Sequence, residues 1–331
     1  MSLPAMIKAT FLRAALCAAA IGSAFAGGEG WTDDFEAAKA EAAAKGQSLL
    51  MDFTGSDWCG WCIKLNEEVF SKDPFKEGVK DKFVLVELDY PQDQSKLSDE
   101  TKKQNEKLQE QYAITGFPTI VLADTKGRPF ATGGYREGGA EAYVSFLDGQ
   151  LGKLKARNEA FDKAEKLEGT EKAEALVAAL EAMELSDELV AEFYDATVSE
   201  IKAADPEDTT GFSAKMEEKK QYAAFEMKLN SLAREGDHEA ALKFVDETIE
   251  KDEFKGESKQ QIAMIKAMIL AQLTRFDESL VAFDAAKEIN PNSELGERIG
   301  SFKERVAQMA EEAKSAGDST DKPAEEEEAA E

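Results

Sequence analysis

The residues in this sequence best suited to chemistry are two cysteines, Cys59 and Cys62, separated by two residues. They follow an apolar run at 49–51 and a break at 54–57, and residues with helical apolar spacing come after them. This pattern predicts a strand, a turn and a helix, with both sulfurs at the start of the helix. Unpaired backbone N–H groups and the helix dipole favour negative charge there and lower the pKa of the first thiol.

The spacing of the two cysteines suits sulfur exchange. Cys59, as a thiolate, can attack a disulfide, and Cys62 can then close back on Cys59 and resolve the mixed disulfide. A structural bridge across two residues closes a very short loop and stabilises a fold little. A metal site needs about four ligands, and apart from Cys17 near the N-terminus the only other soft ligand, His238, lies far along the chain. We therefore favour redox chemistry and expect no metal at this motif.

The overall charge of the chain argues against two classes of partner. Its 331 residues are enough for two domains, and 43% are hydrophobic, so packed cores are possible. Acidic residues outnumber basic residues 67 to 40, which gives a net charge of −27. Nucleic acids and anionic membrane surfaces attract basic patches, so neither is an expected partner.

Residues 1–26 have the features of an export signal. Lys8 and Arg13 precede an apolar stretch at 14–22, and Ala-Phe-Ala at 24–26 is a small-residue cleavage site. The stretch is too short to span a bilayer, so we expect no membrane insertion once the signal is removed. Cleavage removes Cys17, whose poor lipobox makes lipid attachment unattractive. The mature protein would then be exported, in the periplasm or another extracytoplasmic space.

The region from residue 31 to 153 alternates helices and strands. Thr32 or Asp33 can cap a first helix, a strand follows at 48–53, and the cysteine helix comes next. The later elements are a β-branched strand, a helix, a strand that begins after a proline, a hairpin strand and a last helix, at 82–89, 99–112, 119–122, 128–133 and 140–151. The predicted order is therefore α-β-α-β-α-β-β-α.

This order, the Trp-Cys-x-x-Cys helix start and the Gly-Phe-Pro-Thr strand start at 116–119 resemble the thioredoxin family over residues 31–153. The resemblance implies an α/β thioredoxin-like fold and thiol:disulfide oxidoreductase activity without a dissociable cofactor. It also implies that Cys59 is the exposed nucleophile and Cys62 the buried resolving thiol. Pro118 is expected to be cis and to stack against the cysteine pair, although a trans edge-strand proline is the alternative.

The same resemblance assigns roles to residues around the cysteines. Asp52 is expected to be the buried acid that exchanges a proton with Cys62; the alternative is a solvated strand end. Phe117 would offer its backbone to an extended substrate segment. The remaining positions of the expected substrate surface are Trp58, Gly60 and Trp61. The two tryptophans could instead be packing residues, and we favour docking more strongly for Trp58.

Three features depart from the common thioredoxin pattern. The dipeptide between the cysteines is Gly60-Trp61 rather than Gly-Pro, so the choice between reductant and oxidant stays open. Asp52 lies seven positions before Cys59, one more than usual, which lengthens the turn. Glu87 takes a position where many thioredoxins have lysine. If both carboxyls point inward, Glu87 should raise one apparent pKa of the pair.

The second half of the chain has helix-forming composition. We assign residues 154–313 to an all-α domain of about eight helices, with breaks at or near 169, 186, 205–211, 236, 254–256, 275 and 290. Segments beginning at 236 and 275 resemble each other with residues 38 apart in step, and they look like tetratricopeptide-type hairpins of stretched period. Residues 314–331 are expected to be a disordered acidic tail.

Two hypotheses from different classes follow. The first is an exported thiol:disulfide oxidoreductase that acts on protein disulfides and exchanges electrons with a redox partner protein. If it works as a reductant, the analogy implies an inner-membrane donor. The second is an interaction scaffold, in which helical hairpins bind a peptide or protein in a groove. A plain helical bundle that supports the first domain is the simpler reading of the same helices.

Overall fold

The computed structural model describes residue 28 and residues 30–318. The expected export signal at 1–26 and the end of the expected tail, from 319 onward, lie outside the described residues. The chain divides into two compact units, Met1–Thr210 and Gly211–Glu331, and each is described here by itself.

The first unit is built on a five-stranded sheet with the order β1-β3-β2-β4-β5. The first three strands are parallel, β4 runs antiparallel to β2, and β5 runs antiparallel to β4. The strands are β1 (Trp31–Thr32), β2 (Ser48–Thr54), β3 (Phe83–Asp89), β4 (Thr119–Ala123) and β5 (Pro129–Gly133). The central strand β2 has neighbours on both sides and is buried along its whole length, which explains its apolar run at 49–51.

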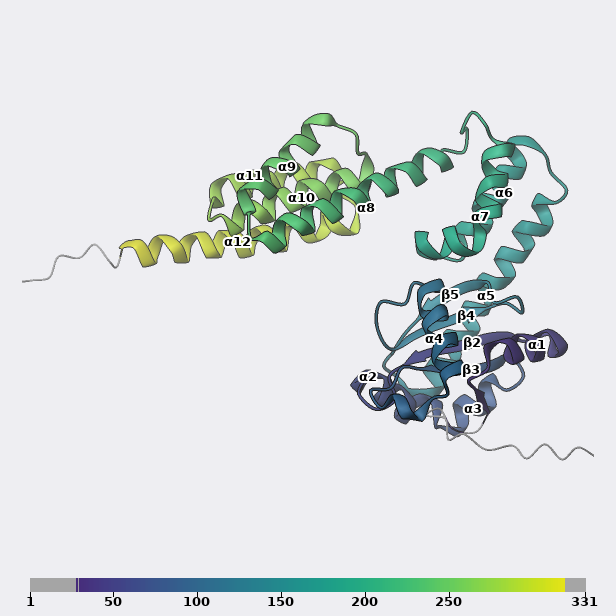
Figure 1. The fold of residues 1–331 in the computed structure, drawn as a ribbon. Helices are drawn as coiled ribbons and strands as arrows, with labels where there is room; N and C mark the ends of the chain where they lie inside the picture. The colour runs from purple at the N-terminus through teal and green to yellow at the C-terminus, as the bar shows by residue number, and fades with distance from the viewer. Residues whose placement is uncertain (1–27, 29, 319–331) are drawn as a thin grey trace, which may run out of the picture. The chain divides into compact units, whose positions relative to one another are not determined.

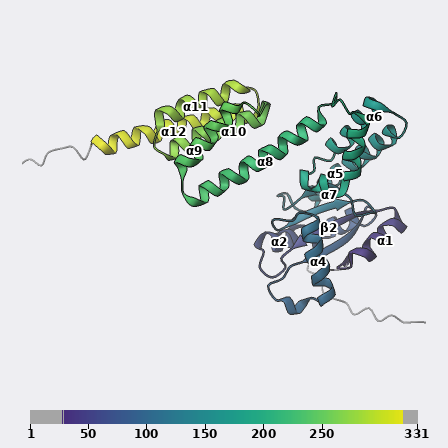
Figure 2. The same ribbon diagram turned by 45° about the horizontal axis from the view of Figure 1, so that its top comes forward.

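Helices cover both faces of this sheet (Figures 1 and 2). Alternate residues of β2 and β3, such as Met51 and Val86, pack with α1 (Phe35–Lys45) and α4 (Asp99–Gln111) in one core. On the other face, the ring of Phe70 contacts the rings of Trp31 and Tyr143. The elements there are α2 (Gly60–Leu65), the π-helical turn η1 (Asn66–Phe70), α3 (Asp73–Val79) and α5 (Gly139–Ala164).

The predicted α/β order is confirmed, with additions at three places. The short strand β1 precedes α1, whose N-cap is Asp34, one residue after the last capping position that we expected. The cysteine helix continues as η1 and is followed by a separate helix, α3. A 3-10 turn, η2 (Gln94–Lys96), forms within the segment that looked like a polar loop.

The two units divide further along the chain than the composition boundary at 153/154. Helix α5 runs through that boundary without a break. Helices α6 (Gly169–Glu181) and α7 (Asp187–Ala204) belong to the first unit. Leu189 of α7 is part of the core over the sheet, and the Tyr194 hydroxyl donates to the Pro129 carbonyl at 2.7 Å. The amino-acid composition of the chain indicates where the helical region begins, whereas these tertiary contacts determine to which unit each helix belongs.

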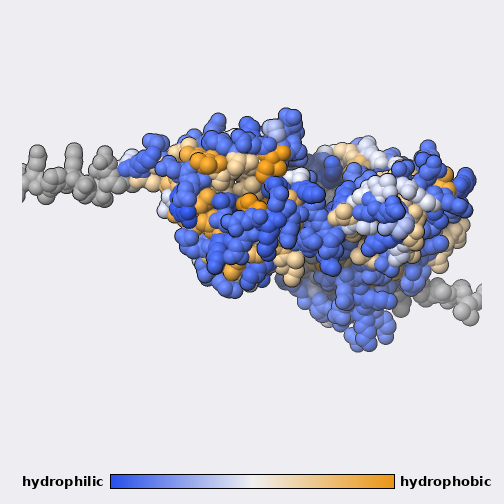
Figure 3. Space-filling view, turned by 90° about the horizontal axis from the view of Figure 1, so that it is seen from above, coloured by the Kyte–Doolittle hydropathy of each residue, from blue (hydrophilic) through white to orange (hydrophobic). Residues whose placement is uncertain are grey.

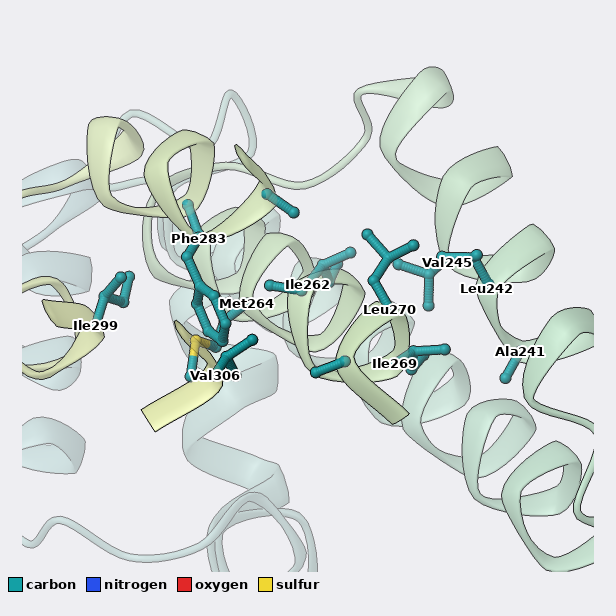
Figure 4. Packing of buried hydrophobic residues seen from close by; sticks show 14 of the residues in the cluster. Ala241, Leu242, Val245, Ile262, Met264, Ile269, Leu270, Phe283, Ile299 and Val306 are labelled. Carbon is teal, nitrogen blue, oxygen red and sulfur yellow. The ribbon is translucent and has the colours of Figure 1, made fainter. Parts of the chain in front are cut away.

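The second unit consists of helices, as predicted. They are α8 (Phe212–Glu235), α9 (His238–Lys251), α10 (Gly256–Gln272), α11 (Phe276–Ile289) and α12 (Glu294–Asp318). Met264, Phe283 and Val306 from three of these helices meet in its core (Figure 4). The predicted breaks all separate helices, and α9 and α11 begin 38 residues apart. Helix α12 continues into the first five residues of the expected tail, to Asp318.

Candidate active site

Cys59 and Cys62 form a disulfide at the start of α2. Figure 1 shows α2 at one end of the central strand β2, where the strand ends and the turn before the cysteines begins. Cys59 is the N-cap residue, and its Sγ accepts a hydrogen bond from the Cys62 backbone N–H at 3.2 Å. A donor in this position stabilises negative charge on a sulfur. The predicted strand–turn–helix placement of both sulfurs is confirmed.

Both cysteines are buried in the disulfide form. Cys62 is 4% exposed, as a resolving thiol should be, but Cys59 is only 6% exposed. The expectation of an exposed Cys59 is therefore wrong for this form. The reason is that its Sγ is turned inward, toward the bond with Cys62 and the amide that donates to it. Exposed Trp58 and Trp61 lie on either side of Cys59 in the sequence, at 44% and 57% exposure.

The long turn before Cys59 is fastened to the segment that follows β3. The Asp57 carboxylate accepts from the backbone N–H groups of Gln92 and Asp93, at 2.8 and 3.2 Å, and pairs with Lys96 at 2.8 Å. The hydrogen bond from Lys96 is the largest of the effects that lower the pKa of Asp57 to about 2. Ser56 donates to Asp89 through both its N–H and its hydroxyl. The extra residue in this turn is thus held in place rather than loose.

Two aromatic groups flank the disulfide-bearing turn and helix. On one side, the Trp58 ring meets the Phe117 ring edge-on at 5.7 Å, and its indole N–H donates to the Tyr90 carbonyl at 2.8 Å. On the other, the Trp61 ring lies 5.1 Å from that of Tyr135, with the Lys64 ammonium about 5 Å from both ring centres. Both tryptophans therefore pack and remain exposed at once, so the two expected roles are not exclusive.

The peptide bond between Phe117 and Pro118 is cis, as the resemblance implies. Antiparallel register pairs Thr119 of β4 with Phe53 of β2, so Pro118 lies beside the end of β2 where the turn to Cys59 begins. Gly60, the first residue of α2, is exposed. The fold thus gathers the predicted residues of the substrate surface at one end of the sheet.

Asp52 is a buried carboxyl on the sheet face opposite to Met51 and Phe53. It is 6% exposed, and its Oδ1 has no hydrogen-bond partner in the described part of the chain. Burial raises the pKa of Asp52 well above its ordinary value, and the negative charges of Glu87 and Asp89 raise it further. Parallel register pairs Asp52 directly with Glu87, which is 5% exposed. The alternative of a solvated strand end does not fit this burial.

Sequence reasoning missed several residues that shape the site. Asp57 and Tyr90 hold the turn and Trp58 through partners 35 and 32 positions away. Tyr135 contacts Trp61 and Lys64, which are 74 and 71 positions away. No local sequence pattern predicts such contacts, because they depend on the paths of the loops after β3 and β5. Within residues 30–318, no group of three or more His, Cys, Asp or Glu side chains is arranged to hold a metal ion. His238 begins α9, in the other unit.

Part of the first unit matches a known family. Residues 35–148 match a family model described as a thioredoxin-like domain. This part of the chain is a thioredoxin-like domain, and it carries its disulfide at the Cys-x-x-Cys motif.

Two curated relatives from Chlamydia pneumoniae are similar to about a third of the chain. The disulfide bond reductase DsbH is 38% identical over 103 residues, which are 31% of this chain and 61% of that protein. The thioredoxin-related protein DsbJ is 31% identical over 98 residues, 30% of this chain and 28% of that protein. The chain thus spans less than two thirds of the length of either relative.

Solved structures include similar chains. A DsbH oxidoreductase is 34% identical, with a TM-score of 0.35, and the match covers 37% of this chain and 83% of that one. The oxidised C-terminal domain of DsbD from Neisseria meningitidis is 14% identical, with a TM-score of 0.25, over 34% of this chain and 90% of that one.

Proposed function

We propose that this protein is a thiol:disulfide oxidoreductase that acts on disulfides of other proteins through Cys59 and Cys62. The observation that carries the proposal is the disulfide at the N-terminus of α2, whose Cys59 Sγ accepts a backbone N–H. The relatives named as a disulfide bond reductase and a thioredoxin-related protein support it. A structural bridge would not need the aromatic surface that surrounds this one.

The exchange takes two steps. In the reduced protein, the Cys59 thiolate attacks one sulfur of a substrate disulfide, which forms a mixed disulfide and releases the first substrate thiolate. The Cys62 sulfur then attacks Cys59 Sγ and releases the second substrate thiolate. Two electrons pass to the substrate, and the Cys59–Cys62 bond forms again. A partner dithiol must supply two electrons to reduce it for the next cycle.

Asp52 is the proposed proton acceptor for Cys62. A thiol must lose its proton before its sulfur attacks, and Cys62 is buried, so a nearby base is needed. A carboxyl whose pKa is raised by burial takes a proton from a thiol more readily than an ordinary aspartate does. In this role Asp52 receives the Cys62 proton during the second step and returns it when the disulfide is reduced.

The proposed substrate surface is the exposed rim around the disulfide. Trp58 and Trp61 provide apolar area, and Gly60 adds no side chain between them. Phe117 and the cis Pro118 precede β4, where an extended segment of a partner can lie against the backbone. Substrates of this site would be disulfides in flexible segments with apolar neighbours.

The proposed setting is an extracytoplasmic compartment, and the proposed direction of electron flow is toward the substrate. The export features of residues 1–26 support the location, and the name of the reductase relative supports the direction. Among the described residues, no helix is both long and apolar enough to cross a membrane.

A turnover assay tests the proposal. Protein that begins at residue 28 should catalyse the reduction of insulin disulfides by dithiothreitol, and Cys59→Ser should abolish the catalysis. A Ser71→Ala variant, changed at the exposed C-cap of the turn η1 that continues this helix, is the matched control and should retain wild-type turnover. Equal turnover by wild type and Cys59→Ser would remove the enzymatic account and leave the scaffold function.

A groove in the second unit favours a second function beside the first. Its volume is about 630 Å³, and it lies between α9 and α11 over α10, with apolar walls that include Ile249, Leu270 and the exposed Val281. Figure 3 shows apolar residues gathered on the surface of these helices. We propose that the groove binds an amphipathic helix of a partner protein. Val281→Glu should abolish pull-down of that partner and leave insulin reduction unchanged; retained pull-down would contradict the groove.

A further inference from the structure

Strand β3 brings two more carboxyls to the sheet face that carries Asp52. Adjacent parallel strands lie about 4.8 Å apart, and residues in register point to the same side. Asp52 pairs with Glu87 in this register, and Asp89 lies two residues further along β3, opposite Thr54. The three acidic residues therefore share one face, the face covered by the cysteine helix and α5.

The three carboxyls differ in their contact with solvent and partners. Asp52 and Glu87 are 6% and 5% exposed, whereas Asp89 is partly buried and accepts two hydrogen bonds from Ser56, at 2.9 and 2.6 Å. The Asp52 Oδ1 atom has no partner in the described residues. An ionised Asp52 is thus a buried charge with no hydrogen bond to one of its oxygens and with a second carboxyl beside it in register. A carboxyl in these surroundings holds its proton tightly.

The other groups that face Asp52 do not compensate its charge. Tyr143 of α5 donates its hydroxyl to the Gly134 carbonyl, and burial raises the pKa of Tyr143, so the phenol stays neutral. The antiparallel neighbour on β4 is Ile120, which is apolar. Arg136 affects Tyr143 and is not among the groups that shift the pKa of Asp52. Glu87 is therefore the charged neighbour best placed to set the behaviour of Asp52.

We propose that Glu87 is a positioning residue for the exchange reaction, whose negative charge sets how tightly Asp52 holds the proton that it takes from Cys62. The inference rests on the proposed function, in which Asp52 is the acceptor. When the Cys62 sulfur attacks Cys59 Sγ, its proton moves to the Asp52 carboxylate. The charge of Glu87 makes Asp52 bind that proton more tightly, which favours the transfer. It also shifts the reaction to higher pH, because Asp52 must be ionised before it can accept the proton.

The pH profile of the second step tests this role. Reduced wild type is mixed rapidly with a chromophoric aromatic disulfide, and release of the second aromatic thiolate, which accompanies the attack of Cys62 on Cys59, is followed over time as a function of pH. Glu87→Gln removes the charge and keeps the shape of the side chain, so the midpoint should move down by about one pH unit. Glu87→Asp keeps the charge and should hold the wild-type midpoint. An unchanged midpoint in a folded Glu87→Gln protein would overturn the inference.

A second measurement needs no variant. In wild-type reduced protein, ¹³C NMR of the carboxyl carbons should show Asp52 and Glu87 titrating together, each signal sensing both steps. Two independent single-step curves would overturn the coupling. Failure of the proposed function has a different signature, since wild type and Cys59→Ser would then show equal turnover in the insulin assay. Insulin turnover that depends on Cys59, together with independent carboxyl titrations, would leave the oxidoreductase in place and remove only the role of Glu87.

Discussion

Cys59 and Cys62 differ in surroundings although they share one bond. The Cys59 Sγ accepts an amide N–H at the helix start, whereas Cys62 lies within the first turn of the helix and is 4% exposed. Reduction frees both sulfurs, and the same amide can then stabilise a thiolate on Cys59 only. The asymmetry that the reaction needs is therefore built into the position of each residue.

This asymmetry predicts selective alkylation. In fully reduced protein at pH 7, iodoacetamide should modify Cys59 at least about tenfold faster than Cys62, because thiolate fraction and access both favour the first cysteine. Peptide mass spectrometry after short exposures measures the two rates. Equal rates, or faster modification of Cys62, would contradict the assignment of Cys59 as nucleophile.

The raised pKa of Asp52 predicts how stability depends on pH. The folded protein retains a proton that the unfolded chain releases near the ordinary value of 3.8. Stability should therefore fall as pH rises from there through the raised folded pKa. Asp52→Asn removes this loss. The free energy of unfolding of the variant, relative to that of wild type, should therefore rise by up to about 1.4 kcal/mol per pH unit over that range. Urea unfolding at several pH values measures the difference; parallel profiles would refute a raised pKa.

The sequence motif was sufficient for some of these residues and insufficient for others. Cys59, Cys62 and the cis Pro118 could be predicted because two separated motifs carry them. The burial of Cys59 in the disulfide form could not, because it follows from the direction in which the sulfur turns. The contacts of Asp57 and Tyr135 depend on loops whose paths only tertiary packing decides.

At the scale of elements, the turn from β2 to α2 behaves as part of the loop after β3. Asp57 connects them through Gln92, Asp93 and Lys96, and Trp58 adds the bond to the Tyr90 carbonyl. An added residue in a turn usually brings conformational freedom. Here these contacts restrict it, and the cysteines keep a defined place despite the longer spacing from Asp52.

The Asp57 contacts predict a local effect of its removal. In Asp57→Ala, amide hydrogen exchange at Gln92 and Asp93 should become roughly tenfold faster or more, because both N–H groups lose their acceptor. Asp81→Ala, at another exposed aspartate, is the control and should leave both rates unchanged. Since the folded pKa of Asp57 is lowered to about 2, wild type should lose the same protection only as pH falls toward that value. Unaltered exchange in Asp57→Ala would show that other contacts hold the loop.

At the scale of the whole molecule, the chain combines a thioredoxin-like unit with a helical unit. The helical composition after residue 154 could be read from the sequence, and so could the breaks between helices. The sequence could not show that α6 and α7 belong to the first unit, because that depends on tertiary contacts. The Arg157 guanidinium, for example, pairs with the Asp124 carboxylate at 3.1 Å and donates to the Tyr194 hydroxyl at 2.8 Å. Residues from two sides of the composition boundary thus share one interior.

Truncation distinguishes the two boundaries. A protein of residues 28–210 should fold and reduce insulin, because it contains the complete first unit. A protein of residues 28–153 loses Arg157, Leu189 and the ring of Phe193 that lies 4.7 Å from that of Tyr112. Its free energy of unfolding should be lower by about 2–5 kcal/mol, as for deletion of large buried side chains. Equal stability of the two fragments would place the boundary at 153/154 instead.

The central claim is that Cys59 exchanges sulfur with a disulfide of another protein and that Cys62 completes the exchange. The most direct measurement uses Cys62→Ser, which lacks the resolving sulfur. Incubated with a disulfide-bonded protein such as insulin, the reduced variant should accumulate a covalent mixed disulfide through Cys59, visible by intact mass and reversed by dithiothreitol. Wild type should accumulate none. Absence of the adduct in Cys62→Ser, with Cys59 reduced and the protein folded, would contradict the account.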